Sequence, residues 1–182
     1  MESDADNELL ERFRQGDRAA FTELVKRYQK PIYNAAFWVL RKAEDANDVT
    51  QIVFLKVVER LDDYNPQYKF FSWIYRIAVN ESLNLLRRNG HEDPLDDDVE
   101  YEAPQSSTPE WQVGATEQSQ RVQDTLMRMS TNDRTVLSLR HFSECSYEEI
   151  AQVLEIDEKT VKSRLFDARK RMRLLLDDLR VH

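Results

Sequence analysis

The segment from Ser146 to Arg173 constrains the fold of this chain more than any other feature. Ser146 is followed three residues later by Glu149, which is the pattern of a capping box at a helix start. Asp157 can cap a second helix in the same way. Apolar residues at helical spacing give each helix one buried face; these residues are Ile150, Val153 and Leu154, then Val161, Leu165, Ala168 and Met172. Two such helices around a tight turn predict a helix-turn-helix that can enter a DNA groove.

The second of these helices is strongly cationic. From Lys159 to Arg173 it carries seven basic side chains and one acidic side chain, Asp167. Such a face can neutralise several phosphates, so its binding to DNA should depend strongly on salt. The alternative is an ordinary helical hairpin with a solvated basic face. The agreement of caps, turn and cations favours DNA binding.

The net charge of −8 is concentrated in one segment. Residues 1–88 and 111–182 each contain equal numbers of acidic and basic side chains, whereas residues 89–110 contain eight acidic and no Lys or Arg residues. This segment also holds three prolines and few large apolar residues, so we expect a flexible acidic linker. With only three glycines and few alternating runs, the chain is predicted to be all-α, with two small helical domains at 1–88 and 111–182.

Several classes of protein are disfavoured by composition. The chain has no apolar run long enough to span a membrane and no signal peptide at its start, so a cytoplasmic location is predicted. Cys145 is the only cysteine, is expected to be at least half-buried, and excludes an internal disulfide; a redox-sensor role is the less favoured alternative. Neither the acidic run at 96–98 nor the three histidines have metal-site spacing. We therefore predict no cofactor, no metal and no enzymatic activity.

Three amphipathic helices are predicted before residue 62. The first covers residues 7–15 and ends at Gly16, and Asp17 caps the second. Pro31 should kink or interrupt this second helix before it resumes through Leu40. The third covers about 44–61 and has an apolar stripe of Val49, Ile52, Val53, Val57 and Leu61.

Aromatic and cationic residues alternate between residues 64 and 76. The segment contains Tyr64, Tyr68, Lys69, Phe70, Phe71, Trp73, Tyr75 and Arg76. Rings interleaved with cations can stack on unpaired bases, although a core aromatic cluster is the commoner meaning of such residues. Residues 62–69 should form a loop, and a helix from about Ser72 to Arg88 should leave Trp73, Arg76, Asn80, Asn84 and Arg87 on one polar face. Binding of single-stranded or distorted DNA is favoured here.

Three segments resemble, in order and spacing, the extracytoplasmic-function (ECF) family of bacterial sigma factors. They are DANDVTQIVFLKVVERL, YKFFSWIYRIAVNESLNLLRR and CSYEEIAQVLEIDEKTVKSRLFDARKRM. The resemblance implies a region 2 domain at 1–88, a region 4 domain at 111–182 and a role in promoter-specific transcription initiation. The linker, 89–110, would pass near the active centre and RNA exit channel of the polymerase, where its acidic residues could mimic nucleic acid or simply act as a spacer.

The resemblance also implies roles for individual residues. Docking on the clamp helices of the largest polymerase subunit would involve Asp48, Gln51 and Phe54. Binding of the minus-ten element would involve Tyr64, Tyr68, Lys69, Phe70, Phe71, Trp73, Arg76 and Asn80, with one base flipped into the loop. Recognition of the minus-thirty-five element would involve Lys159, Lys162, Ser163, Arg164, Phe166, Asp167, Arg169 and Lys170. Many relatives have arginine at the positions of Lys162 and Asp167, so this chain's upstream sequence preference should differ.

The implied partners are core RNA polymerase, including its beta flap, promoter DNA and an anti-sigma factor that could hold the chain at the inner membrane. Direct membrane insertion is not expected, and the regulon is expected to be stress-responsive. One rival reading is a regulator with a sensory amino-terminal domain, and another is a helical enzyme whose acidic residues bind a divalent ion on nucleic acid. The first would need a ligand pocket or a receiver-like alternation of strands and helices, and the sequence indicates neither before residue 88.

Overall fold

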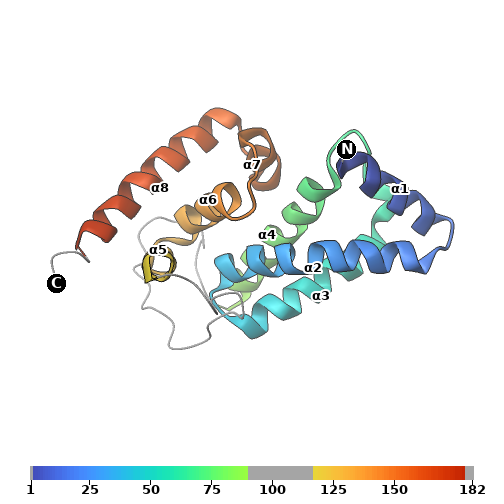
Figure 1. Cartoon of the computed structure of the whole chain (residues 1–182), viewed down its shortest axis with the longest axis horizontal. Coiled ribbons are helices and arrows are strands. Elements are labelled where there is room, and N and C mark those ends of the chain that lie inside the picture. Colours follow the sequence, from blue (N-terminus) through green and yellow to red (C-terminus); the bar gives the residue numbers. More distant parts are fainter. Residues whose placement is uncertain (1, 90–116, 179–182) are drawn as a thin grey trace.

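The computed structural model describes residues 2–89 and 117–178, which form helices and connecting loops (Figure 1). An amino-terminal lobe contains α1 (Glu2–Arg14), α2 (Arg18–Leu40), α3 (Ala43–Glu59) and α4 (Phe70–Arg88), with a short 3-10 turn at Leu61–Asp63. A carboxy-terminal lobe contains α5 (Glu117–Arg128), α6 (Thr131–His141), α7 (Tyr147–Leu154) and α8 (Glu158–Asp178). The predicted all-α, two-lobe fold is confirmed. The predicted acidic linker lies almost entirely outside the described residues, as do the acidic run at 96–98, His91 and His182.

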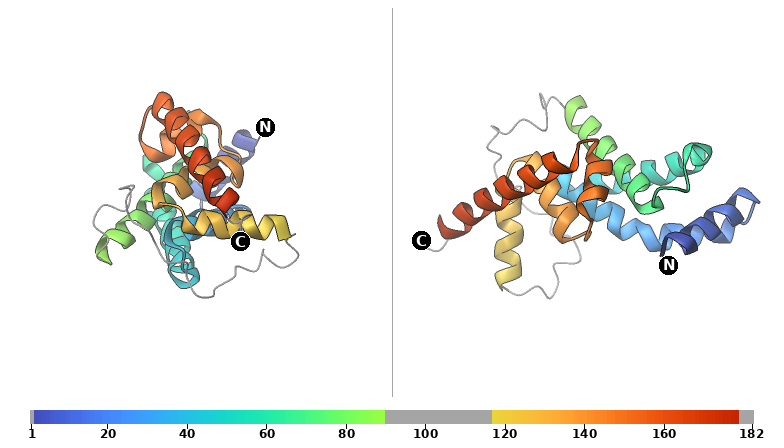
Figure 2. Two further views of the ribbon diagram at one scale, coloured as in Figure 1. Left: turned by 90° about the vertical axis from the view of Figure 1, so that its left-hand side faces the viewer. Right: turned by 90° about the horizontal axis from the view of Figure 1, so that it is seen from above.

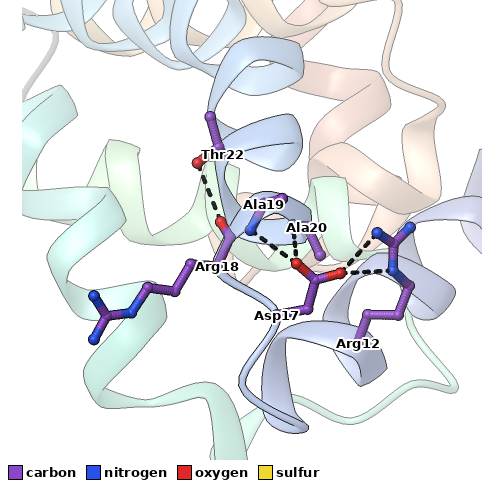
Figure 3. Close-up of polar contacts among 6 residues, drawn as sticks. All are labelled: Arg12, Asp17, Arg18, Ala19, Ala20 and Thr22. Carbon is purple, nitrogen blue, oxygen red and sulfur yellow. Dashed lines mark hydrogen bonds and ion pairs between the residues drawn. The ribbon is translucent and has the colours of Figure 1, made fainter.

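The turn before α2 forms as its sequence predicts (Figure 3). Gly16 adopts a φ of 96°, a conformation that L side chains rarely adopt, and so ends α1. The Asp17 carboxylate accepts hydrogen bonds from the backbone amides of Ala19 (2.9 Å) and Ala20 (3.3 Å), and the Arg12 guanidinium donates to its second oxygen at 2.7 Å. The hydrogen bond from Arg12 lowers the pKa of Asp17. This cap satisfies two backbone amides at the start of α2 that have no partner within the helix.

Helix α2 continues through Pro31, so of the two expectations for this residue, a kink or an interruption, the interruption is wrong. Proline removes one backbone donor and crowds the preceding turn, at a cost of about 3 kcal/mol. The residues that follow offset that cost because nearly all of them are buried; they are Ile32, Ala35, Ala36, Phe37, Trp38, Val39 and Leu40. The helix ends at Arg41, which has a left-handed backbone (φ 63°) and donates its backbone amide to the carbonyl of Phe37.

The core of the amino-terminal lobe lies between α2, α3 and α4. The predicted stripe on α3 is buried at Val49, Val53 and Val57, and Ile52 is half-buried. Helix α4 begins at Phe70, two residues earlier than predicted, because the Phe70 ring is buried edge-on against Tyr28 with centroids 5.5 Å apart. A position between the predicted loop and the predicted helix is therefore part of the core.

The carboxy-terminal lobe contains the predicted helix-turn-helix. Ser146 and Glu149 form the capping box of α7, in which each side chain accepts a hydrogen bond from the other residue's backbone amide. Asp157 caps α8 by accepting from the Thr160 amide at 2.8 Å. The apolar face of α8 is buried at Val161, Leu165 and Ala168 and half-buried at Met172. Helix α6 packs against α8 and is buried around its whole circumference from Thr131 to Leu139.

The two lobes pack directly against each other, with α6 lying on α2 and α7 lying on α4 (Figure 2). Arg134 of α6 is fully buried and donates hydrogen bonds to the backbone carbonyls of Trp38 and Val39 at the end of α2. The Phe142 ring stacks on the Trp38 ring with centroids 4.9 Å apart. The sequence patterns predicted both lobes but gave no indication of this contact.

Candidate nucleic-acid and polymerase interfaces

One face of α8 is open to solvent and carries the basic residues predicted to read DNA. The exposed members are Lys159, Lys162, Ser163, Phe166, Arg169 and Lys170. The Phe166 ring is 69% exposed although it lies mid-helix, and Asp167 beside it is half-exposed. Exposure of a large ring among cations is unfavourable in water, so this face has the composition of a binding surface.

Two arginines of α8 bind side chains of α6 and so help to hold the two helices together. Arg164, which was predicted to lie near phosphates, donates to Asn132 Oδ1 at 3.2 Å and is only half-exposed. Arg171 forms a bidentate pair with the buried carboxylate of Asp133, with N···O distances of 2.5 and 2.6 Å. Sequence reasoning missed Asn132 and Asp133. The only sequence feature that could have indicated them is the helix cap at Ser130, which places both residues in the first turn of α6.

The aromatic segment divides into core residues and surface residues. Tyr64 and Phe70 are buried, and Phe71 is half-buried and stacks on the buried Tyr75 ring at 4.2 Å. The Tyr64 hydroxyl donates to the Tyr68 carbonyl at 2.7 Å, and burial raises the pKa of Tyr64 to about 12. These rings pack beneath the loop, so for them the interpretation as a core aromatic cluster is the correct one.

The remaining predicted minus-ten residues reach the surface. Tyr68 is 53% exposed, Lys69 and Asn80 are exposed, and Trp73 and Arg76 are half-exposed. Trp73 leans on Tyr64 and Phe70, with ring centroids 5.4 and 5.9 Å away, so one side of the indole is fixed by the core. A ring held in this way loses little conformational freedom when a base stacks on it.

A pocket of about 400 Å³ opens beside this surface, which is within the size range of small-molecule sites. Its amino-terminal-lobe lining includes Tyr64, Tyr68, Ser72, Trp73 and Arg76. Gln152 of α7 and Glu155, which directly follows that helix, complete the lining from the other lobe. The pocket is therefore built by the contact between the lobes, and sequence reasoning did not anticipate it.

Two ion pairs cross between the lobes at the same place. Lys69 Nζ lies 2.6 Å from Glu149 Oε1, and Arg76 Nη1 lies 3.8 Å from Glu155 Oε1. The hydrogen bond with Glu149 raises the pKa of Lys69. Partial burial alone would raise the pKa of Glu149, but the hydrogen bonds from Lys69 and Ser146 outweigh it and the pKa is lowered. Both members of this pair are thus held in their charged forms.

A second exposed face lies on α3, on the opposite side of the helix from its buried stripe. Asp48 and Gln51 are exposed as predicted, and they continue into Leu55 (62% exposed) and Val58 (47% exposed). Phe54 is half-buried and packs edge-on against Phe21 at 6.3 Å. Leu55 and Val58 were missed, although Leu55 lies four residues after Gln51 and Val58 three residues after Leu55, a spacing that places all three on the same face of a helix.

The described part of the chain shows no group of three or more His, Cys, Asp or Glu residues placed to hold a metal ion. Burial lowers the pKa of His141, as do the nearby charges of Arg169 and Arg140. Cys145 is buried, as expected, and burial raises the pKa of its thiol to about 12. Among the described helices, none combines the length and apolar character needed to cross a bilayer.

Comparison with known proteins assigns both lobes. Residues 24–92 match Sigma-70 region 2, and residues 119–172 match Sigma-70, region 4. The RNA polymerase sigma-H factor of Pseudomonas aeruginosa is 33% identical, over 93% of this chain and 93% of that protein. The ECF RNA polymerase sigma-E factor of Escherichia coli K12 is 34% identical, over 91% of each chain.

Solved structures agree with this assignment. CnrH, in a complex with the cytosolic domain of CnrY, superposes with a TM-score of 0.72 and is 28% identical, covering 96% of this chain and 98% of that one. The sigma factor RpoE of Bartonella quintana, in a complex with the anti-sigma factor NepR, has the same fold with a TM-score of 0.70 at 24% identity, covering 86% and 96%.

The two lobes are thus those of a sigma-70-type transcription factor, a regulator of transcription. This chain belongs to the ECF family of RNA polymerase sigma factors and acts in transcription initiation. The family resemblance and the function that it implied are confirmed.

Proposed function

We propose that the three exposed surfaces divide the work of initiation between them. The α3 face of Asp48, Gln51, Leu55 and Val58 docks on the clamp helices of the largest polymerase subunit, with Phe54 bracing it from behind. This docking role is supported by Leu55 and Val58, which expose apolar surface beside polar residues. Such a pattern is more typical of a protein interface than of a surface that faces only solvent. The division into a region 2 domain at 1–88, a linker at 89–110 and a region 4 domain at 111–182 is part of the same proposal.

The minus-ten element is bound by the loop before α4 and by the first turns of α4. We assign base stacking to Tyr68 and Trp73 and phosphate contacts to Lys69 and Arg76, with Asn80 further along the strand. Tyr64, Phe70 and Phe71 shape the loop from the core side rather than touching bases. The energy of flipping a base is a few kcal/mol, and stacking on aromatic rings at about 1 to 3 kcal/mol per base can offset it.

The minus-thirty-five element is read by α8 in the major groove. Lys162, Ser163, Phe166 and Asp167 face base edges, and Lys159, Arg169 and Lys170 contact phosphates. Arg164 has its main role in holding α8 on α6, since it donates to Asn132. The beta flap of the polymerase is the expected second contact of this lobe.

An anti-sigma factor is the proposed regulator of this chain, because two structural relatives are seen in complexes, one of them with a named anti-sigma factor. Such a partner would place the chain in the cytoplasm or at the inner face of the membrane, with a stress-responsive regulon. The acidic residues of 89–110 are proposed either to mimic nucleic acid in the polymerase or to act as a spacer.

The observation that carries the proposed residue roles is the grouping of Tyr68, Lys69, Trp73 and Arg76 at one surface, with one side of the Trp73 indole fixed by the core. The test is reconstitution of the full chain with core polymerase and sequencing of the transcripts. Promoter-specific transcripts that core polymerase alone does not make support the proposal. Specific binding to duplex DNA without polymerase, together with no transcript in its presence, would overturn it.

Trp73→Ala tests the minus-ten assignment within that assay. It should reduce promoter opening by about five- to 150-fold, since one stack of about 1 to 3 kcal/mol is lost, while binding to core polymerase is unchanged. Permanganate footprinting measures opening, and fluorescence anisotropy measures binding to the polymerase. Equal losses of both would show that Trp73 is only a structural residue.

A further inference from the structure

Helix α1 is joined by hydrogen bonds to the segment that leads into α4, residues 61–69. Arg14 Nη2 donates to the Leu61 carbonyl at 3.0 Å, and Asn7 Oδ1 lies 3.0 Å from the Tyr64 hydroxyl. These partners are 47 and 57 positions apart in the chain. Local helix geometry therefore does not produce the contacts, and they tie the loop of the proposed minus-ten surface to the first helix.

The contact with Asn7 reaches Tyr68 through one buried side chain. Tyr64 is 4% exposed, and its hydroxyl has two acceptors within reach, Asn7 Oδ1 at 3.0 Å and the Tyr68 carbonyl at 2.7 Å. Burial raises the pKa of Tyr64 to about 12, so the phenol keeps its proton near neutral pH and remains a donor. The backbone of Tyr68 is thus held from the core side, while its ring is 53% exposed.

A second route leads from α1 to Trp73. The Asp6 carboxylate is buried and accepts hydrogen bonds from the Tyr28 hydroxyl and, at 2.6 Å, from the Arg27 guanidinium. The Tyr28 ring lies edge-on against Phe70, and the Phe70 ring lies 5.9 Å from the Trp73 indole. Hydrogen bonds to an ionised carboxylate are stronger than those between neutral groups. The rings beneath Trp73 are therefore also held by a residue of α1.

The polar contacts are separate from the packing that attaches α1 to the lobe. Leu9 and Leu10 are buried in the core and provide that attachment. Apolar packing is not directional, whereas a hydrogen bond weakens steeply as its angle changes. The bonds to Leu61 and Tyr64 therefore select one conformation of the loop. Helix α1 also precedes residues 24–92, which match Sigma-70 region 2, so that match assigns it no role.

We propose that α1 is a positioning element for the minus-ten surface and that Asn7 is its key residue, holding the loop before α4 in the conformation that accepts a strand. The inference rests on the minus-ten assignment proposed above. Asn7 acts through Tyr64 and does not itself contact DNA. A loop that is already ordered loses less conformational entropy when Tyr68 and Trp73 stack on bases, so promoter opening is favoured.

Asn7→Leu removes the acceptor and keeps nearly the same side-chain shape. In the reconstituted holoenzyme it should reduce promoter opening by about two- to tenfold, the range expected for the loss of one net hydrogen bond, while binding to core polymerase is unchanged. Permanganate footprinting measures opening, and fluorescence anisotropy measures binding. The matched control is Gln15→Leu, which removes an amide that donates to Glu11 of the same helix and should change neither quantity.

A double-mutant cycle tests whether Asn7 acts through the Tyr64 hydroxyl. Tyr64→Phe removes the hydroxyl and keeps the buried ring, so it should also lower opening. Adding Asn7→Leu to Tyr64→Phe should then change opening by less than about twofold, because the partner of Asn7 is already gone. Additive effects of the two substitutions would overturn the inference.

Hydrogen exchange measures the order of the loop directly in the full chain. The backbone amides of Tyr64 and Tyr68 donate to carbonyls within the segment, those of Leu61 and Asn65, at 3.2 and 3.1 Å. Asn7→Leu should make the peptide 61–69 exchange about two- to tenfold faster, whereas Gln15→Leu should leave its exchange unchanged. Unchanged exchange in Asn7→Leu would overturn the inference even if opening falls.

Comparison with Trp73→Ala separates this inference from the minus-ten assignment. If Trp73→Ala lowers opening and Asn7→Leu does not, the inference fails and the assignment stands. Equal losses of opening and of polymerase binding in Asn7→Leu would make Asn7 a general structural residue and would also overturn the inference. If neither substitution changes opening, the minus-ten assignment itself fails, and the positioning role of α1 fails with it.

Discussion

Arg134 Nη2 donates a hydrogen bond of 3.0 Å to the backbone carbonyl of Val39, across 95 residues of chain. The same guanidinium donates to the Met129 carbonyl of its own lobe at 2.7 Å. One buried side chain thus joins the end of α2 to the start of α6. Both lobes lose a hydrogen-bond donor if it is removed.

Arg134→Met should lower the free energy of unfolding by about 2 to 4 kcal/mol, because buried carbonyls are left without a donor. Chemical denaturation followed by circular dichroism measures this change. Arg128→Met, at an exposed position on α5, is the control and should change it by less than about 0.5 kcal/mol. Equal effects of the two substitutions would contradict the assigned role of Arg134.

Leu55→Glu should weaken binding to core polymerase by about tenfold or more, because it places a charge at the centre of the proposed docking face. Since the side chain is 62% exposed, the free energy of unfolding should stay unchanged. Surface plasmon resonance on immobilised core polymerase measures the affinity. Thr22→Glu adds the same charge on an exposed side of α2 and should have no effect. If both variants bind normally, the docking face lies elsewhere.

Asp167→Ala should change which base is preferred at one position of the minus-thirty-five element, with a discrimination of about 1 to 3 kcal/mol at stake. A carboxylate only accepts hydrogen bonds, so it selects a donor such as the cytosine amino group. Lys162→Ala should alter the base preference at a neighbouring position of the same element. Transcription from a library of upstream elements by the reconstituted holoenzyme gives the preference.

The control for the reading helix is Lys170→Ala, which should weaken all promoters about equally, as expected for loss of a phosphate contact. An unchanged ranking of upstream elements with Asp167→Ala would show that this part of α8 does not face the bases.

Asp17→Asn should lower the free energy of unfolding near neutral pH. In acid the variant and the wild type should be equally stable. The hydrogen bond from Arg12 holds the pKa of Asp17 below its usual 3.8 in the folded chain, so the stabilisation is present above that value and is lost as the pH falls through the lowered pKa. Asparagine caps helices as well as aspartate does, and so the comparison isolates the charge. Thermal unfolding between about pH 6 and pH 2 measures it.

The matched background for Asp17 is Arg12→Gln. In that background the pH-dependent difference between aspartate and asparagine should shrink, because the main cause of the shifted pKa is gone. Parallel pH curves for wild type and Asp17→Asn would show that the charge of Asp17 makes no contribution.

Local signals predicted much of the fold because they depend on nearby residues. The caps at Asp17, Ser146 and Asp157 and the stripe from Val49 to Val57 are short-range patterns, and all of them are confirmed. The helix runs through Pro31 without an interruption because the local penalty of proline is offset by burial against α3 and α4, which no local pattern reports.

The sequence predicted which residue types form the candidate site, but not which of their side chains are exposed at the surface. Spacing could place Tyr64, Phe70 and Trp73 in one segment, yet it could not say that two of these rings are buried and one reaches the surface. Exposure depends on which neighbours cover a ring, and those neighbours include Tyr28 from α2.

The sequence by itself determined α1 to α4, α7 and α8, the caps of α2, α7 and α8, the cationic face of α8 and the family, because each of these is encoded in residues close together along the chain. Only the tertiary structure decided that Lys69 meets Glu149, that Arg134 reaches Val39 and that α7 closes one side of the minus-ten pocket. Such contacts join residues about 80 to 95 positions apart, and they form only where packing of whole helices offsets the entropy of bringing them together.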